Sequence, residues 1–129
     1  MTRSVDQRRA PDYIAKAEEF LKTASDSLQN KRYNSAVTNA VHSSINALDA
    51  VTTSFKGKRA SDDHTEVLSL VQGIFSAQEY EEIKKQFTSL ISKKNASEYQ
   101  PDSMGHKDAQ DSVKWAERIL SKVKAKLKS

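Results

Sequence analysis

Apolar positions recur every three or four residues along most of this chain, which is the spacing of an amphipathic helix. The pattern begins after Pro11, a residue suited to a first helical turn, and keeps one apolar face to about Gln29. It resumes at Tyr33 and continues to Phe55. The two apolar stripes consist of Ile14, Ala17, Leu21, Ala24 and Leu28, and then Val37, Ala40, Val41, Ser44, Leu48 and Val51. Two long helices joined by a short turn are therefore predicted.

Capping signals mark the starts of the next two helices. Asp63 fits an N-cap with the acidic residue Glu66 at N3, and the short helix that follows it stops near Gly73. Ser76 and Glu79 form a second capping box. It begins a long helix whose apolar positions are Tyr80, Ile83, Phe87, Leu90 and Ile91. This helix runs into the hexapeptide KNASEY at residues 94–99.

The last helix begins near Gly105, after a loop at Pro101, because the residue before a proline avoids the helical region. Its apolar stripe is Ala109, Val113, Ala116, Leu120, Val123 and Leu127. No segment shows the alternation typical of a strand. The sequence thus predicts an all-α, up-and-down bundle of four long helices plus one short helix, with the small-residue-rich 33–55 helix at its centre. We expect residues 1–10 to form a flexible basic N-terminus and residues 11–129 a single domain.

Composition narrows the possible functions. The chain of 129 residues has no cysteine, which excludes disulfides, cysteine-ligated zinc and thiol catalysis. Its net charge of +4 is carried by the ends, because residues 1–10 hold +2, residues 114–129 hold +5 and residues 11–113 hold −3. The C-terminal cations either attract RNA or an acidic partner, or only complement the dipole of the last helix. With no apolar run near ~18 residues and no signal-peptide pattern, a cytoplasmic protein without membrane association is expected.

The three histidines do not form a recognisable metal or catalytic motif. No HxxxH or HExxH pair and no glycine-rich phosphate loop is present, so we expect no metal site and no cofactor. His42 and Asn46 belong to a polar stripe on the central helix, which either lines a cleft or dimer seam or forms a solvent face. We expect His64 to be structural and His106 to be exposed.

The order of these elements resembles the HEPN family of small prokaryotic helical domains. Residues 13–51 resemble its first helix pair, and DHTEVLSLV at residues 63–71 resembles its mid-domain histidine and short helix. Residues 94–123, which begin with KNASEY, resemble its closing segment. The resemblance extends over about residues 12–124 and implies the HEPN-like helical fold.

The resemblance also assigns roles within KNASEY. Nuclease members of the family have an arginine followed four to six residues later by a histidine, and two such motifs meet at a dimer interface to cleave RNA without metal. Lys94 stands at the arginine position, Asn95 at the polar residue after it, and Tyr99 at the histidine position. A tyrosine with a pKa of about 10 is only ~0.1% ionised at pH 7, and a lysine lacks the planar fork of arginine. We therefore assign no catalytic residue, and the candidate RNA- or nucleotide-binding residues are Lys94, Asn95, Tyr99, His42 and Asn46.

Three functions remain open. The first is a non-catalytic HEPN-type module that binds RNA, a nucleotide or a protein partner in a toxin–antitoxin, defence or regulatory system. The second is a metal-independent endoribonuclease toxin with a divergent site, which an imidazole within hydrogen-bonding reach of Lys94 would favour. The third is a purely structural dimerisation bundle. The resemblance further implies a homodimer and a nucleotidyltransferase-type partner protein. In a purely structural reading of the hexapeptide, Asn95 or Ser97 caps the helix and Tyr99 packs over the final helix.

Overall fold

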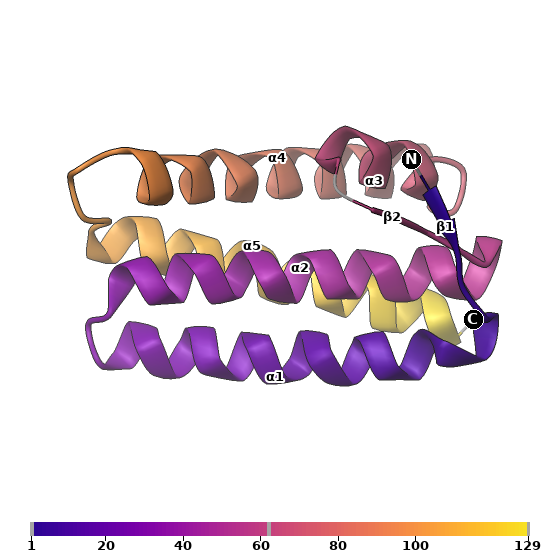
Figure 1. The fold of residues 1–129 in the computed structure, drawn as a ribbon, viewed down its shortest axis with the longest axis horizontal. Coiled ribbons are helices and arrows are strands. Elements are labelled where there is room, and N and C mark those ends of the chain that lie inside the picture. The colour runs from indigo at the N-terminus through magenta and orange to yellow at the C-terminus, as the bar shows by residue number, and fades with distance from the viewer. Residues whose placement is uncertain (1, 62, 129) are drawn as a thin grey trace.

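The computed structural model describes residues 2–61 and 63–128. Its long helices are α1 (Ala10–Gln29), α2 (Tyr33–Lys56), α4 (Ala77–Tyr99) and α5 (His106–Lys128), and its short helix is α3 (His64–Val71). The long helices lie side by side, and α3 lies at the end of the bundle where α4 begins (Figure 1). The predicted all-α bundle of four long helices plus one short helix is confirmed.

Helix α2 is the centre of the bundle, as its many small residues predict. It contacts α1, α4 and α5, and Figure 1 shows it running between α1 and α4. The hydroxyl of Ser43 donates a hydrogen bond of 2.7 Å to the backbone oxygen of Ala17, which requires close approach of α1 and α2. Fully buried side chains of the core include Val37, Val41, Leu48, Val51, Ile83, Phe87, Leu90, Ile119 and Val123. Burying one such side chain stabilises the fold by about 1.5–3 kcal/mol.

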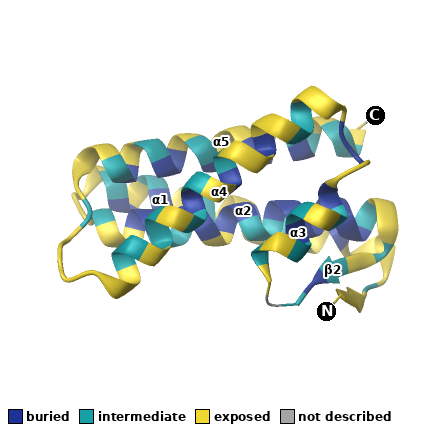
Figure 2. Cartoon of the chain, turned by 90° about the horizontal axis from the view of Figure 1, so that it is seen from above, coloured by how far each residue is buried: buried dark blue, intermediate teal, exposed yellow. Residues whose placement is uncertain are grey.

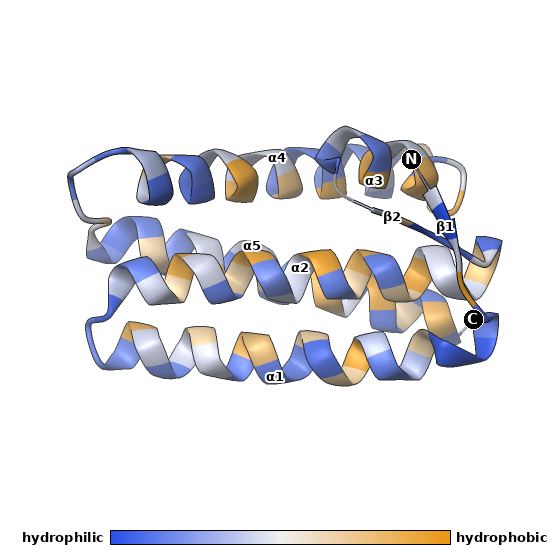
Figure 3. Ribbon diagram, viewed as in Figure 1, coloured by the Kyte–Doolittle hydropathy of each residue, from blue (hydrophilic) through white to orange (hydrophobic). Residues whose placement is uncertain are grey.

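The amphipathic pattern read from the sequence is visible in the structure. Buried residues recur along the long helices in Figure 2, between exposed ones, and polar and apolar residues alternate along the same helices in Figure 3. The predicted capping box is confirmed, because Ser76 Oγ accepts from the Glu79 amide and Glu79 Oε1 accepts from the Ser76 amide, both at 3.2 Å. Asp63 caps α3 by accepting from the amide of Thr65 at 2.9 Å. Gly57 ends α2 in the left-handed region, with φ of 63°.

The sequence predicts no strand, and this prediction is wrong. Strand β1 (Thr2–Ser4) pairs antiparallel with β2 (Lys58–Ala60), and the Val5 amide donates to the backbone oxygen of Gly57 at 2.9 Å. A 3-10 turn, η1 (Gln7–Arg9), then leads into α1. Within residues 1–10, expected to form a flexible tail, Thr2–Ser4 and Gln7–Arg9 therefore carry regular structure. Three-residue strands that are mostly polar and exposed leave no alternation in the sequence, and their pairing partner is distant along the chain.

Candidate functional site

The hexapeptide at residues 94–99 forms the last turns of α4, and its residues point in different directions. Lys94 continues the buried stripe of Ile83, Phe87 and Leu90 at steps of four, three and four residues. The Lys94 side chain is only 22% exposed, and its ammonium forms an ion pair with Glu98 at 3.2 Å. Lys94 is thus a cation at the inner face of α4, held by a neighbouring carboxylate.

Asn95 and Tyr99 lie on the outer side of the same helix. Asn95 is exposed, and Tyr99 is 80% exposed. The structural reading of the hexapeptide is wrong in both of its parts. Neither Asn95 nor Ser97 caps α4, because the helix continues to Tyr99 and its C-cap is Gln100. Tyr99 does not pack over α5, since an exposed fraction this large leaves most of its ring in solvent. One copy of the chain therefore does not bring Lys94 and Tyr99 together.

His42 and Asn46 are separate from the hexapeptide. The exposed His42 ring lies 5.3 Å from the ring of Phe20 in α1, measured between centroids. The side-chain amide of Asn46 donates to the backbone oxygen of His42 at 2.8 Å, within the same helix. Among the described residues, neither of the two makes a hydrogen bond, ion pair or ring contact with residues 94–99. The predicted five-residue site is therefore not assembled within one chain.

The structure instead places the imidazole of His64 against Phe87, on the face of α4 that also carries Lys94. His64 opens α3, and its ring meets that of Phe87 edge-on, with centroids 5.9 Å apart. Burial lowers the pKa of His64 below its ordinary value, and the positive charge of Lys94 lowers it further, against the opposing effect of Asp63. Both effects favour the neutral imidazole. No hydrogen bond joins it to Lys94 in the described part of the chain.

The sequence predicts a structural role for His64 and does not predict that its ring lies on the same side of α4 as Lys94. Phe87 and Lys94 are seven residues apart, two helical turns, so their shared face on α4 is readable from spacing. What spacing does not reveal is that His64, at the start of α3, lies against Phe87 on that face. The only local signal is the Asp63 cap, which fixes where α3 begins and therefore where the imidazole is presented.

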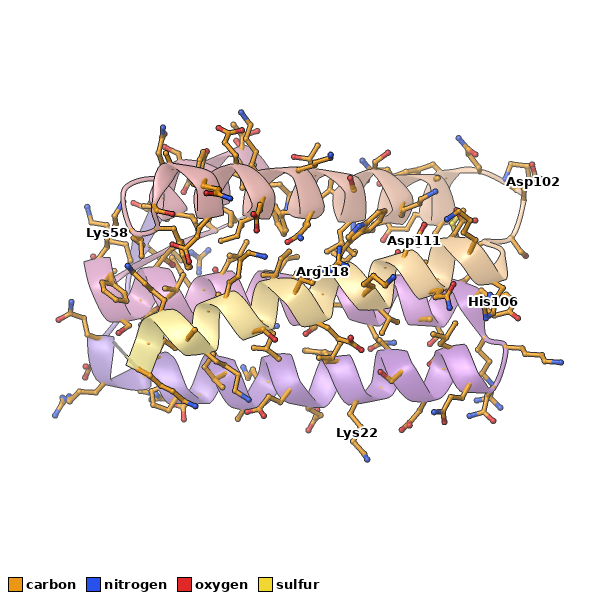
Figure 4. The ribbon with its side chains drawn as sticks, turned by 180° about the vertical axis from the view of Figure 1, so that it is seen from behind. Lys22, Lys58, Asp102, His106, Asp111 and Arg118 are labelled. Carbon is orange, nitrogen blue, oxygen red and sulfur yellow. The ribbon has the colours of Figure 1, made fainter. Side chains whose placement is uncertain are left out.

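Behind the hexapeptide, polar contacts fasten the end of α4 to the rest of the bundle. Asn34, at the start of α2, accepts with its side-chain oxygen from the Met104 amide at 2.9 Å and from the Ser97 hydroxyl at 3.5 Å. Lys93 pairs with Asp108 of α5 at 2.6 Å. The Lys93 ammonium and the Gly105 amide, in that order, lower the pKa of Asp108. The exposed His106, labelled in Figure 4 at the start of α5, meets Tyr33 edge-on at 5.7 Å.

The chemistry available around Lys94 is limited. A lysine ammonium holds phosphate oxygens as a point charge, and a neutral imidazole accepts a proton. The Glu98 carboxylate competes with any anion for Lys94. Across residues 2–61 and 63–128, no three or more histidine, aspartate or glutamate side chains gather as a metal site. No helix in that part of the chain has the length and apolar character needed to cross a membrane.

Comparisons with known proteins agree with this fold. A search of curated proteins finds no match to this sequence. Among solved structures, the fold is similar to the crystal structure of TT1696 from Thermus thermophilus, with a TM-score of 0.75 and 19% sequence identity. The match covers 92% of this chain and 98% of that one. The family model described as HEPN domain matches residues 10–126. The chain belongs to the HEPN family, as the order of its helices indicates.

Proposed function

We propose that this HEPN-family chain is a non-catalytic module that binds RNA, with Lys94 holding a phosphate of the strand. The observation that carries the proposal is the position of Lys94 on the inner face of α4, 22% exposed and paired to Glu98. A partly desolvated ammonium attracts a phosphate more strongly than a fully exposed one, because water screens the charge less. The carboxylate of Glu98 keeps this cation in place when no anion is bound.

Two features of the site support binding without cleavage. Tyr99 occupies the position at which a nuclease of the family has its histidine, and a phenol with a pKa of about 10 is a poor base at neutral pH. His64, the imidazole near Lys94, is not hydrogen-bonded to it. Its lowered pKa also leaves little imidazolium to protonate a leaving oxygen.

The test is a titration of labelled single-stranded RNA, followed by fluorescence anisotropy at several salt concentrations. Lys94→Ala should weaken binding and reduce the slope of log affinity against log salt by about one phosphate contact. Glu98→Gln should strengthen binding, because it removes the competing carboxylate. Lys22→Ala is the matched control, since Lys22 projects from α1 on the side away from α4 (Figure 4). Equal loss of affinity in Lys94→Ala and Lys22→Ala would contradict the proposal.

The second candidate is a metal-independent endoribonuclease, and the specific observation in its favour is the imidazole of His64, which lies against Phe87 on the face of α4 that carries Lys94. The same RNA, incubated with chelator and analysed on a gel, separates the two functions. We expect the strand to stay intact. Cleavage that disappears in both Lys94→Ala and His64→Ala would overturn the non-catalytic proposal. Cleavage that persists in Lys94→Ala points to a contaminating nuclease and is removed by further purification before the assay is read.

We also propose that the chain is a homodimer in the cytoplasm, working beside a nucleotidyltransferase-type partner protein. Membership of the HEPN family supports dimerisation. The 80% exposed aromatic side chain of Tyr99 supports it as well, since a large aromatic ring in solvent is a typical interface residue. Light scattering of the purified chain tests this, and a monomer at micromolar concentration would remove the proposal. A dimer that binds no RNA in the titration above would instead favour a purely structural dimerisation bundle.

A further inference from the structure

The ribbon formed by β1 and β2 has one open edge. Strand β1 pairs only with β2 in this two-stranded sheet, and all of its residues are exposed. Strand β2, by contrast, also contacts α2 and α3. Figure 1 shows β1 crossing the end of the bundle near the C-terminus. The free edge of a strand presents N–H and C=O groups to which another strand can pair.

The register of the ribbon decides which backbone groups of β1 are free. The Val5 amide donates to the backbone oxygen of Gly57 at 2.9 Å, and two residues earlier Arg3 lies opposite Arg59. Hydrogen-bonded and non-hydrogen-bonded pairs alternate along an antiparallel ladder, so Arg3 and Arg59 form a hydrogen-bonded pair. The residues on either side of Arg3 therefore point their N–H and C=O groups away from β2, toward the open edge.

The ribbon is basic, and two of its cations lie opposite each other. Arg3, Lys58 and Arg59 are cations, and neither strand contains an acidic residue. Like charges directly opposite each other in a sheet are destabilising. In the part of the chain that the structure describes, none of the three cations forms an ion pair. Figure 4 shows Lys58 at one end of the bundle. A carboxylate from outside the chain would relieve the repulsion.

The carboxyl group on which Arg59 acts does not supply this neutralisation. It belongs to Asp49 of α2, whose pKa burial raises to about 7, against the smaller effect of Arg59. A group with this pKa is only partly ionised at neutral pH. Asp49 is also buried, whereas Arg3 is exposed. The ribbon therefore keeps positive charge beside the free backbone groups of its edge.

A second copy of this chain does not suit the edge. Two antiparallel β1 strands joined through the outward groups of Thr2 and Ser4 would place Arg3 opposite Arg3. This would be a non-hydrogen-bonded pair, in which the Cα atoms are only about 4.5 Å apart, so the two cations would repel. Phosphates of a nucleic acid would neutralise the cations but lack the alternating donors and acceptors of a strand. An extended peptide with a carboxylate at its central position meets both requirements.

We propose that the open edge of β1 binds an extended, acidic segment of a partner protein, which adds to the ribbon as a third strand. Its backbone pairs with Thr2 and Ser4, and a glutamate or aspartate lies opposite Arg3. Residues opposite each other share a face of the sheet, so this carboxylate lies on the face that carries Arg3 and Arg59. The surface is separate from Lys94, and the proposal does not depend on RNA binding.

The charge preference is tested with the full-length chain and a short labelled peptide in which glutamate alternates with valine. Fluorescence anisotropy should show saturable binding, and much weaker binding of the matched peptide with lysine in place of glutamate. Arg3→Glu should weaken binding of the glutamate peptide about tenfold, because it turns an attractive cross-strand pair into a repulsive one. The same variant should bind the lysine peptide better than wild type does, which loss of folding would not produce.

The backbone pairing is tested at Ser4. Proline is tolerated on an edge strand where its nitrogen faces solvent, so Ser4→Pro should keep the ribbon and lose a donor to the peptide. We expect it to weaken binding of the glutamate peptide several-fold. In wild type, hydrogen exchange followed by NMR should slow at the Ser4 amide when the peptide is added. Exchange at the Arg3 amide, already bonded to β2, should change little.

Lys22→Glu is the matched control, since it makes the same change of charge in the middle of α1 (Figure 4). It should bind the glutamate peptide as wild type does, and circular dichroism will verify that each variant folds. Equal affinity for the two peptides, or equal loss in Arg3→Glu and Lys22→Glu, would overturn the proposal.

Two further outcomes would assign the edge to another occupant and also overturn the proposal. A dimer in light scattering that Ser4→Pro dissociates would assign the edge to a second copy of the chain. Loss of RNA affinity in Arg3→Glu, with no binding of the glutamate peptide, would assign the cations to nucleic acid. The RNA titration of Lys94→Ala is read separately, so failure of this proposal is distinguishable from failure of the RNA-binding function.

Discussion

The ammonium of Lys94, near the end of α4, lies close enough to the imidazole of His64, at the start of α3, to depress its pKa. The two residues are 30 positions apart in sequence. Burial is the larger cause of the shift and the Lys94 charge is the second. The pair therefore links the lysine of the proposed RNA-binding site to the imidazole on which the second candidate function rests.

This coupling predicts that Lys94→Gln raises the pKa of His64, since the substitution removes a positive charge while the ring keeps its contact with Phe87. A proton NMR titration of the imidazole measures the change. Lys93→Gln is the matched control, because Lys93 pairs with Asp108 and has no part in the His64 shift. An unchanged His64 titration in Lys94→Gln would show that the two groups are not coupled in solution.

A second prediction concerns Asp49, a carboxyl group buried in α2. Burial raises its pKa to about 7, against the smaller opposing effect of Arg59. The folded state therefore binds more protons than the unfolded state between about pH 4 and pH 7, so the free energy of unfolding falls as pH rises through this window. The loss is at most about 4 kcal/mol, at about 1.4 kcal/mol per pKa unit. Below about pH 4 both states are protonated and the stabilisation is fully present.

Asp49→Asn should remove most of this pH dependence, because its amide resembles the protonated acid. We expect the variant to be more stable than wild type at about pH 8, measured by urea unfolding, and close to wild type at about pH 5. If both proteins lose the same free energy between these two conditions, Asp49 is not the responsible group.

The third prediction tests the hydrogen bonds of Asn34 at the end of the bundle where α4 ends. Asn34→Ala removes the acceptor for the Met104 amide and for the Ser97 hydroxyl. We expect a loss of about 1 kcal/mol in unfolding free energy and faster hydrogen exchange at the Met104 amide. Asn39→Ala is the control, since the side-chain amide of Asn39 donates only within its own helix, to Ser35. Comparable exchange at Met104 in both variants would mean that Asn34 does not hold the loop.

The fourth prediction compares the cost of replacing two glycines, Gly57 and Gly105, that differ in backbone conformation. Gly57→Ala places a Cβ at φ of +63° and 3.4 Å from the Gln7 side chain, so strain and contact both oppose it. We expect a loss of about 1–2 kcal/mol in the free energy of urea unfolding. At Gly105 the nearest atom to an added Cβ is an Asp108 oxygen at 3.7 Å, an ordinary contact. Gly105→Ala should therefore cost clearly less, and an equal cost at both positions would contradict the argument from φ.

The candidate site is readable from the sequence only in part. The steps of four, three and four from Ile83 to Lys94 place Lys94 on the buried face of α4, because helical spacing alone decides which residues share a face. The same spacing turns Tyr99 outward. Helical spacing does not say which element packs against the buried face. The sequence therefore suggests that His42 shares a binding site with Lys94. In the structure the His42 ring lies against Phe20 in α1.

The sequence by itself determined the helices, their caps and the family. The Ser76–Glu79 box and the left-handed Gly57 are decided by hydrogen bonds and torsions within four residues, and the apolar stripes specify a bundle. Only the tertiary structure decided the β1–β2 pairing, the Asn34–Met104 contact and the approach of His64 to Lys94. These join segments far apart in the chain, and their geometry depends on how whole helices pack, which no local spacing encodes.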